Sequence, residues 1–428
     1  MYEGLTDIGI SAGVAALTEE CESVLENRYS ELREICETNQ YKILSSFIKN
    51  RLSDTHFGFT TGYGYGDPGR DVTERIFADI FGTESSLVRT QIVCGTHALS
   101  IVFSGNLRPG DKLLYCTGAP YDSLWSAVGL NGMGAGQGAL SDFGIGYSQT
   151  DLREDGDFDF EALESALQDK SVRMAAAQRS TGYSERPAIN IEKIKKWADF
   201  VKERRPDVIL MVDNCYGEFL ETKEPTEVGV DIMAGSLIKN PGGGLALSGG
   251  YVAGREELVE KAAYRLTSPG IGKECGLTFG QTRAILQGLF IAPRTVMDAL
   301  KGSMLCGEVF KRMGFYVYPD SGDKRSDIVE TIRLRSPEAL TAFCRGIQAV
   351  SPVDSFIRPE PWEMPGYEDK VIMASGAFVT GSSIELSADG PLRPPYNVYF
   401  QGGLTFEHSK LGVMSAAQKL IDEGLAAI

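Results

Sequence analysis

The sequence predicts an α/β protein that consists of a large domain with a mostly parallel sheet and a smaller C-terminal α+β domain. Three observations support this prediction. The chain has 428 residues, which is long enough for two domains. Short apolar runs alternate with helical stretches from about residue 88 to 254, as in a parallel sheet covered by helices on both faces. From about residue 310 onward, strands and helices are segregated, which indicates an α+β arrangement.

The first predicted element is a long amphipathic helix over residues 18–50, where apolar side chains recur at helical spacing. A segment rich in glycine and tyrosine follows at 57–70. Asp71 and, three residues later, Glu74 have the spacing of a capping box, so the next helix is expected to begin there.

The middle of the chain supplies the predicted sheet domain. Strands are expected at residues 88–94, 112–117, 173–178, 208–213, 232–238 and 247–253. Helices are expected near 97–105, 121–130, 159–168, 190–204, 256–266 and 281–305. Active sites in such sheets lie at the carboxyl ends of the strands, where Asp213 and the turn at Gly95 fall.

The last part of the chain alternates differently. Strands are expected at 315–318, 328–334, 371–378 and 383–387, and helices from Ser336–Pro337 and over 405–426. The predicted organisation is an N-terminal helical arm (residues 1–60), a large α/β domain (61–305) and a smaller C-terminal α+β domain (306–428).

Composition excludes several classes of function. A formal net charge of −16 argues against nucleic-acid and anionic membrane partners. No apolar run approaches the about 20 residues of a membrane span, and the start lacks the basic region of a signal peptide. The eight cysteines are spread singly and the three histidines are scattered, so neither a metal site nor a hydrolytic triad is expected. We expect a cytoplasmic protein with reduced thiols.

The strongest functional signal is Lys239. A short apolar stretch delivers this lysine to a glycine-rich turn, and Asp213 ends the apolar strand 208–213. This layout suits an aromatic aldehyde cofactor, with the lysine forming a Schiff base and the aspartate pairing with the protonated ring nitrogen. To react as a neutral amine, Lys239 is expected to have a pKa that burial and nearby positive charge lower. The alternatives are a surface lysine and an aspartate that serves as a helix cap or in a salt bridge.

Further side chains could complete such a site. The turn at Gly95 and Thr96 enters a helix and leaves backbone N–H groups free to hold a phosphate, to which the Ser236 hydroxyl could also bind. An ordinary strand-to-helix turn is the alternative. Tyr121 could stack on a flat cofactor ring, or could be a core tyrosine. Cys215 is expected to be a small pocket residue.

Two other motifs need an interpretation. Residues 64–69 match the pattern GxGxxG, but no apolar strand precedes them and Pro68 lies inside, which excludes a dinucleotide site. Tyr63 and Tyr65 are better interpreted as polar donors on a loop. Arg393 stands before a pair of prolines in the predicted small domain and suits recognition of a substrate carboxylate. A surface ion pair is the alternative.

Together these residues resemble a fold-type I enzyme that depends on pyridoxal 5'-phosphate (PLP). The residues that carry this resemblance are Gly95-Thr-His-Ala98, Tyr121, Asp213 and Ser236-x-x-Lys239. The longer strings at 62–71, 265–273 and 401–405 are similar to the methionine gamma-lyase-like family, whose members are often named aluminium-resistance proteins or cystathionine beta-lyases. The likeness runs from about residue 15 to the end of the chain.

The resemblance implies a fold-type I PLP-dependent transferase-like fold and a homodimer or homotetramer with active sites at the subunit interface. It assigns the Schiff base to Lys239, the ring nitrogen to Asp213 and ring stacking to Tyr121. It assigns the phosphate to Gly95, Thr96 and Ser236, and makes His97 a further contact of the cofactor. Tyr63 or Tyr65 of the neighbouring subunit would also reach the phosphate, although the Tyr-Ser-Arg arrangement of better-known gamma-lyases is missing here.

The predicted function is that of a PLP-dependent carbon–sulfur lyase. It would carry out β- or γ-elimination on a small-molecule substrate, a sulfur-containing L-amino acid such as cystathionine or methionine, whose carboxylate Arg393 would bind. One alternative is another PLP-dependent amino-acid enzyme, namely an aminotransferase, decarboxylase or aldolase. The other is a non-catalytic metabolite-binding stress protein, against which the pairing of Asp213 with Lys239 argues.

Overall fold

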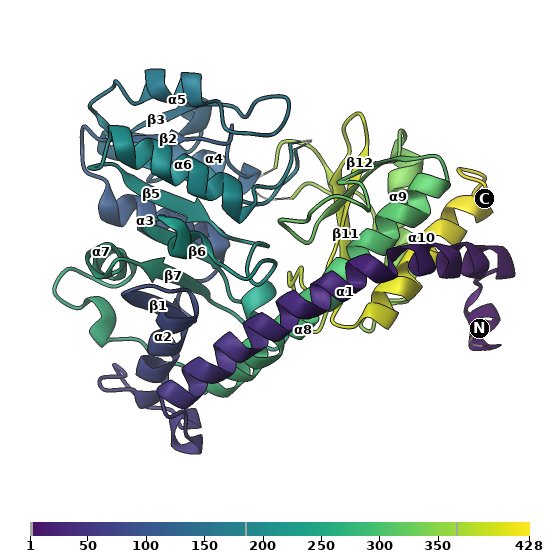
Figure 1. Cartoon of the computed structure of the whole chain (residues 1–428), viewed down its shortest axis with the longest axis horizontal. Coiled ribbons are helices and arrows are strands. Elements are labelled where there is room, and N and C mark those ends of the chain that lie inside the picture. Colours follow the sequence, from purple (N-terminus) through teal and green to yellow (C-terminus); the bar gives the residue numbers. More distant parts are fainter. Residues whose placement is uncertain (1–2, 185, 365–366) are drawn as a thin grey trace. The chain divides into compact units, whose positions relative to one another are not determined.

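The computed structural model describes residues 3–184, 186–364 and 367–428 (Figure 1). The chain forms two compact units. One contains the residues up to Glu37 together with Ile291–Ile428, and the other contains Thr38–Phe290. None of the helices in the described ranges combines the length and apolar character that a membrane span requires.

The unit Thr38–Phe290 is built on one sheet flanked by helices (Figure 1). In its described part, seven strands follow the order β1-β7-β6-β5-β4-β2-β3. Their bounds are Ser85–Arg89 (β1), Lys112–Tyr115 (β2), Gly146–Gln149 (β3), Val172–Gln178 (β4), Ile209–Asp213 (β5), Ile232–Ser236 (β6) and Gly250–Gly254 (β7). The pairs from β3 to β6 are parallel, and β7 is antiparallel to both β6 and β1.

The helices of this unit cover the sheet. Their bounds are Pro68–Ile80 (α2), Gly95–Asn106 (α3), Trp125–Val128 (α4), Phe160–Ala166 (α5), Ile191–Arg204 (α6) and Glu256–Leu266 (α7). Helix α3 packs closely on α7 because Gly105 has no side chain: a Cβ there would lie 2.8 Å from the Lys261 carbonyl oxygen. Apolar residues of α3, α7 and the strands form one buried core. This core fixes the carboxyl edge of the sheet, where β5 and β6 end.

The other unit contains a second sheet. Five strands in its described residues are antiparallel, in the order β10-β11-β12-β9-β8. Their bounds are Tyr316–Tyr318 (β8), Glu330–Arg333 (β9), Val371–Ala374 (β10), Ser387–Pro391 (β11) and Asn397–Gln401 (β12), and the helices are Pro337–Ala349 (α9) and Phe406–Asp422 (α10). A mostly parallel sheet in one unit and a separate antiparallel sheet in the other confirm the predicted α/β fold class.

Two long helices, Ala12–Lys49 (α1) and Thr282–Arg312 (α8), contribute residues to both units. The short 3-10 helices are Glu3–Ile8 (η1), Asp54–Phe57 (η2), Asp122–Leu124 (η3), Leu130–Gly132 (η4), Leu140–Phe143 (η5), Pro225–Val228 (η6), Asn240–Gly242 (η7) and Gly272–Glu274 (η8). The division into an arm and two domains with limits at residues 60 and 305 stays a prediction, and residues 1–2 of that arm lie outside the described residues.

Several predicted element bounds are wrong. The first strand is Ser85–Arg89 rather than 88–94, and the helix predicted near 121–130 is reduced to η3 and the four-residue α4. Helix α2 begins earlier than Asp71, because the Asp67 side chain caps its N-terminus and Pro68 occupies the first turn. Strands β3 and β12 were not predicted, and β11 follows the predicted 383–387. Strand β3 pairs with β2, more than 30 residues earlier in the chain, and β12 contains Asn397 and Gln401 among its apolar residues, so local patterns carry little signal for them.

Candidate active site

The carboxyl edge of the parallel sheet brings Asp213 and Lys239 into one region. Asp213 is the last residue of β5 and pairs with Ala234 of the neighbouring parallel strand β6. Ser236 ends β6, and Lys239 is the residue directly before the short helix η7. The side chain of Asp213 is 5% exposed and Lys239 is partly buried. The acid and the amine therefore follow adjacent strands at the same edge.

The turn after β5 is strained. Tyr216 and Phe219 have positive φ angles of 69° and 65°, which cost energy in residues with a side chain. Between them, Gly217 has no room for a Cβ, which would lie 2.4 Å from the Cδ atom of Arg179. The strain places the Tyr216 ring against the lysine, with the Lys239 Nζ atom 4.0 Å from the ring centroid. An aromatic face therefore contacts the amine.

Arg179 holds this turn in place. Its guanidinium is fully buried and donates to the Asn214 Oδ1 atom at 3.0 Å and to the Gly217 carbonyl oxygen at 2.6 Å. The Glu224 carboxylate lies 3.6 Å from the same guanidinium and offsets its charge. A buried ion pair with several hydrogen bonds gives the turn one geometry.

The charges around the edge shift the pKa of both candidate residues. Burial raises the pKa of Asp213, and Lys239 partly opposes that rise. For Lys239, burial alone would lower the pKa, but the neighbouring Cys215, Tyr216 and Asp213 side chains, with Glu218, raise it above its ordinary value. The expectation of a lowered Lys239 pKa is therefore wrong for the protein by itself. The physical reason is that the groups facing the amine are acids rather than cations.

The N-terminus of α3 lies beside the end of β6. A Cβ on Gly95 would lie 3.3 Å from the Cys215 Sγ atom and 3.6 Å from the Ser236 Cβ atom. The Thr96 hydroxyl forms a hydrogen bond of 2.7 Å with the Ser123 hydroxyl. Gly95, Cys215 and Ser236 are thus in contact range, and the free N–H groups and dipole of the twelve-residue helix α3 favour an anion there.

His97 in the first turn of α3 and Tyr121 just before η3 are the next two candidate residues. The His97 Nδ1 atom accepts from the Val93 N–H at 3.2 Å, and burial lowers the pKa of the imidazole. The Tyr121 N–H donates to the Gln178 Oε1 atom at 2.8 Å. Gln178 pairs with Asp213 across β4 and β5, so its side chain ties Tyr121 to the edge that carries the acid.

Tyr63 and Tyr65 do not join this group in the contacts of the described chain. The two tyrosines are 74% and 63% exposed on the loop before α2, and their rings contact each other at 5.6 Å between centroids. Arg393 belongs to the other unit, where its Nη1 atom forms an ion pair of 3.0 Å with Asp369. That ion pair is the alternative that the sequence left open.

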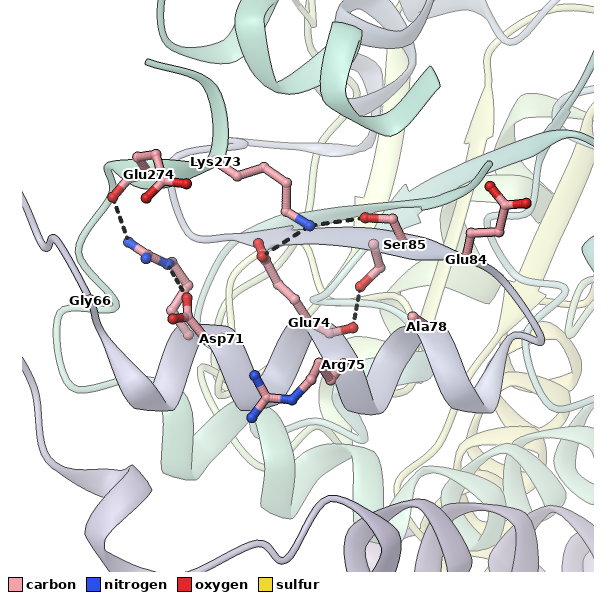
Figure 2. A pocket seen from close by; sticks show the side chains of 11 residues that line it. Gly66, Asp71, Glu74, Arg75, Ala78, Glu84, Ser85, Lys273 and Glu274 are labelled. Atoms are coloured by element: carbon pink, nitrogen blue, oxygen red, sulfur yellow. Dashed lines mark hydrogen bonds and ion pairs between the residues drawn. The ribbon is translucent and has the colours of Figure 1, made fainter. Parts of the chain in front are cut away.

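A separate cavity of about 440 Å³ lies between α2, β1 and the Lys273–Glu274 segment. Figure 2 shows the Lys273 amine pointing to Ser85 and Glu74. It donates a hydrogen bond of 3.0 Å to the Ser85 hydroxyl and forms an ion pair of 3.5 Å with the Glu74 carboxylate. Ser85 and the first residue of β6 both pair with Gly254, so the cavity lies near the sheet edge opposite Lys239. Its main charges are paired with each other, so we assign it no role in the Lys239 site.

Sequence reasoning missed four residues of the site: Gln178, Arg179, Glu218 and Tyr251. A signal existed for Gln178, which ends the predicted strand 173–178 at the same edge as Asp213, and for Arg179, which directly follows it. None existed for Glu218 and Tyr251, which lie 33 residues apart and form a hydrogen bond only in the folded chain. Within the described ranges, no group of three His, Cys, Asp or Glu side chains could hold a metal ion.

Comparison with known proteins places this site in a family. The family model described as methionine gamma-lyase matches residues 14–421. A relative from Bacillus subtilis strain 168, the uncharacterized protein YnbB, is 48% identical over 406 residues, which cover 95% of this chain and 96% of its own. A solved structure of a carbon-sulfur lyase involved in aluminum resistance from Clostridium novyi NT is 48% identical with a TM-score of 0.94, and the match covers 98% of this chain and 100% of that one.

A more distant structure defines the fold. The pyridoxal-5'-phosphate dependent protein YhfS from Escherichia coli is 15% identical with a TM-score of 0.60, over 91% of this chain and 97% of that one. This likeness concerns the fold alone and confirms the predicted fold-type I architecture. Because the family model spans nearly the whole chain, including every residue of the Lys239 site, the chain belongs to the methionine gamma-lyase family.

Proposed function

We propose that the protein is a PLP-dependent carbon–sulfur lyase that acts on a sulfur-containing L-amino acid such as cystathionine or methionine. The observation that carries this proposal is the placement of Asp213 at the end of β5 and of Lys239 just after the adjacent parallel strand β6, where each group shifts the pKa of the other. Family membership and the activity in the name of the Clostridium novyi protein support it.

The residues at this edge fit PLP in three respects. Lys239 supplies an amine. Asp213 supplies a buried acid that, in the described part of the chain, forms no ion pair within 4.0 Å, so a protonated ring nitrogen would be a suitable partner. The N-terminus of α3, with Gly95 against Ser236, supplies the setting for a phosphate.

PLP, when bound, supplies an aldehyde that joins to amines and a ring that accepts the electron pair released at the substrate Cα atom. Lys239 would hold the aldehyde carbon through its Nζ atom, and the same atom would take up the proton from Cα once the substrate amine has replaced it. Asp213 would keep the ring nitrogen protonated, and Tyr121 would lie against the ring. In these roles Lys239 would act as the base, and Asp213 would keep the ring positively charged.

Other residues would hold the ends of the cofactor and the substrate. Gly95, Thr96 and Ser236 would bind the phosphate, with His97 as a further contact. Arg393 would bind the substrate carboxylate and exchange its present partner Asp369 for it, since a guanidinium binds carboxylates in a bidentate manner. Correct orientation of the Cα–H bond accounts for a large share of rate enhancement in general.

The assembly we propose is a homodimer or homotetramer. The high exposure of Tyr63 and Tyr65 supports a role for one of them in the phosphate site of a neighbouring subunit. The eight cysteines are free thiols, which suits the reducing conditions of the cytoplasm.

Substitution of the lysine tests the cofactor assignment. Protein purified from PLP-supplied cells is expected to show a visible absorbance band, and Lys239→Ala is expected to lack it while its circular dichroism spectrum stays unchanged. The physical reason is that the band of the unsubstituted protein arises from the covalent bond between the cofactor aldehyde and this amine, which alanine cannot form. If Lys239→Ala keeps the spectrum of the unsubstituted protein, Lys239 is not the attachment site.

A substrate panel then separates the reactions that PLP supports. Cystathionine, methionine, cysteine and threonine would be incubated with the coloured protein, and thiol, ammonia and keto acid would be assayed. A carbon–sulfur lyase releases a sulfur-containing fragment, ammonia and a keto acid in equal amounts, whereas an aminotransferase forms keto acid without ammonia. A coloured protein with no turnover on any member of the panel would favour the non-catalytic alternative.

A further inference from the structure

Glu218 is a fully buried carboxyl group for which the roles above give no use. It lies in the strained turn after Asp213. Its Oε1 atom accepts a hydrogen bond of 2.6 Å from the Tyr251 hydroxyl. Its Oε2 atom is buried and, among the described residues, has no hydrogen-bond partner. Because a half-satisfied buried acid costs stability, its presence in this turn indicates a functional reason.

The carboxyl group packs against the strand that delivers the lysine. A Cβ on Gly235 of β6 would lie 2.8 Å from both the Glu218 Oε1 atom and the Tyr251 hydroxyl. The Asn240 side chain, next to Lys239, donates to the Glu218 carbonyl oxygen at 3.1 Å. Glu218 therefore lies against Gly235 before Lys239 and against Asn240 after it. The absence of a side chain at Gly235 leaves space for the Glu218–Tyr251 pair.

Glu224, a second buried acid of the same segment, has the contacts expected of a structural residue. Glu224 accepts from the Phe219 N–H at 2.9 Å and from the Asn214 amide at 2.9 Å, and it offsets the charge of Arg179. Glu224 is thus fully paired. Glu218 has no comparable set of partners in the described chain.

The groups that face Glu218 leave one positive charge for it to balance. They are Tyr251 from β7, Glu224 and Cys215 from its own segment, and Lys239 after β6. Burial raises the pKa of Glu218 to about 8, while the Tyr251 hydrogen bond and Lys239 oppose that rise. Burial also raises the pKa of the Cys215 thiol, which keeps it uncharged at neutral pH. Glu218 can therefore gain or lose its charge near neutral pH.

We propose that Glu218, oriented by Tyr251, is the positioning residue that balances the charge of the Lys239 amine. The inference rests on the proposed function, which assigns Asp213 to the cofactor ring nitrogen. An ammonium at Lys239 then needs another acid, because an isolated charge is costly in a buried site. Of the groups that act most on Lys239, Glu218 is the remaining carboxyl.

The test measures the proton affinity of Lys239 in the full-length chain without cofactor. The rate at which a small amine-reactive reagent acylates Lys239 is followed by mass spectrometry of the Lys239 peptide across a pH series. Only the neutral amine reacts, so the rate reports its fraction. Glu218→Gln cannot carry a negative charge, so we expect its Lys239 to be acylated about tenfold faster at pH values above about 8, where Glu218 of the unsubstituted protein is ionised.

Two further variants keep the test specific. Tyr251→Phe retains the Glu218 carboxyl group but removes the hydrogen bond that stabilises its ionised form. We therefore expect a smaller acceleration of acylation than in Glu218→Gln. Glu224→Gln removes a buried acid of the same segment that is not among the groups that act most on the amine. Because the Glu224 charge raises the pKa of Glu218, its loss favours the ionised form of Glu218, so we expect lower stability and no acceleration. Equal acylation rates in the unsubstituted protein and Glu218→Gln, or an equal acceleration in Glu224→Gln, would overturn the proposal.

Cofactor-loaded protein provides the second measurement. The pH midpoint of its visible band is expected to move in Glu218→Gln and not to move in the same direction in Glu224→Gln. A band that is absent from all proteins, together with the expected acylation rates, would refute the proposed function and leave the coupling of Glu218 to Lys239 standing. A normal band and midpoint in Glu218→Gln with unchanged acylation would refute the coupling alone.

Discussion

At the scale of single residues, Lys239 is an amine surrounded by acids. Asp213, Cys215 and Tyr216, with Glu218, raise its pKa against the effect of burial. Such an amine holds its proton tightly and becomes a nucleophile only when positive charge approaches those acids. A protonated ring nitrogen beside Asp213 would supply that charge, so binding of the cofactor and activation of the lysine would be linked.

The raised pKa of Glu218 predicts how the stability of the fold changes with pH. Its pKa is about 8 in the folded protein against an ordinary 4.5, so the folded state holds a proton that the unfolded chain releases between these values. Stability from this group is therefore complete below the lower value and is lost as the pH rises through the higher one. Glu218→Gln removes that loss, because the amide does not titrate and can still accept from Tyr251.

Melting temperatures measure this effect. We expect Glu218→Gln to match the unsubstituted chain near about pH 4 and to exceed its Tm increasingly toward about pH 9. Thermal scans at several pH values, monitored by circular dichroism, give the comparison. A difference in Tm that stays constant with pH would show that Glu218 does not titrate in this range.

At the scale of elements, strand β6 leads to the turn that carries Lys239, and it contains Gly235, which has no room for a side chain. Its strand neighbours β5 and β7 carry Asp213 and Tyr251. Gly235 lets the Tyr251 hydroxyl and the Glu218 carboxyl meet beside the strand, since a Cβ would approach the tyrosine ring to 2.7 Å. The geometry of the pair therefore depends on one missing side chain.

Gly235→Ala tests that dependence. We expect it to destabilise the fold by about 1–3 kcal/mol, because the added methyl group overpacks a buried site. Gly322→Ala is the matched control, since a Cβ on Gly322 meets nothing within 4 Å. Urea unfolding of both variants gives the free energies. If Gly235→Ala unfolds at the same urea concentration as the control, the pair moves aside without cost and the strand does not constrain it.

At the scale of the whole molecule, each candidate site needs residues that one chain does not bring together in its described contacts. Asp213 ends β5 and Lys239 follows the end of the adjacent strand β6, whereas Tyr63 and Tyr65 are exposed on a loop. Under the proposed assembly, a tyrosine of one 46.5 kDa subunit would complete the phosphate site of its neighbour.

Mixing of two inactive variants tests the shared site. Lys239→Ala lacks the amine, and the double variant Tyr63→Phe, Tyr65→Phe lacks the phenol groups. If a site takes one contribution from each subunit, refolding the two variants together is expected to restore part of the turnover, because some mixed dimers contain one complete site. Turnover that stays absent in verified mixed dimers would place both contributions within a single chain.

Much of the fold was predictable because its signals are local. The start of α9 follows from Ser336, whose hydroxyl caps the helix, and from Pro337 in the first turn. The apolar run that ends at Asp213 forms β5, and the run before the glycine-rich turn forms β6. The bounds of α2 and β1 were wrong because a cap at Asp67 and the pairing of Ser85 with Gly254 outweighed local patterns.

By itself, the sequence determined that one strand ends in Asp213 and that a lysine follows the next strand, whose end at Ser236 the structure then fixed. Apolar runs and glycine turns encode such positions over a few neighbouring residues. Only the tertiary structure decided the electrostatic surroundings of that lysine, the hold of Arg179 on its turn and the pairing of Glu218 with Tyr251. These depend on burial and on charges from distant segments, and burial exists only once the chain has folded.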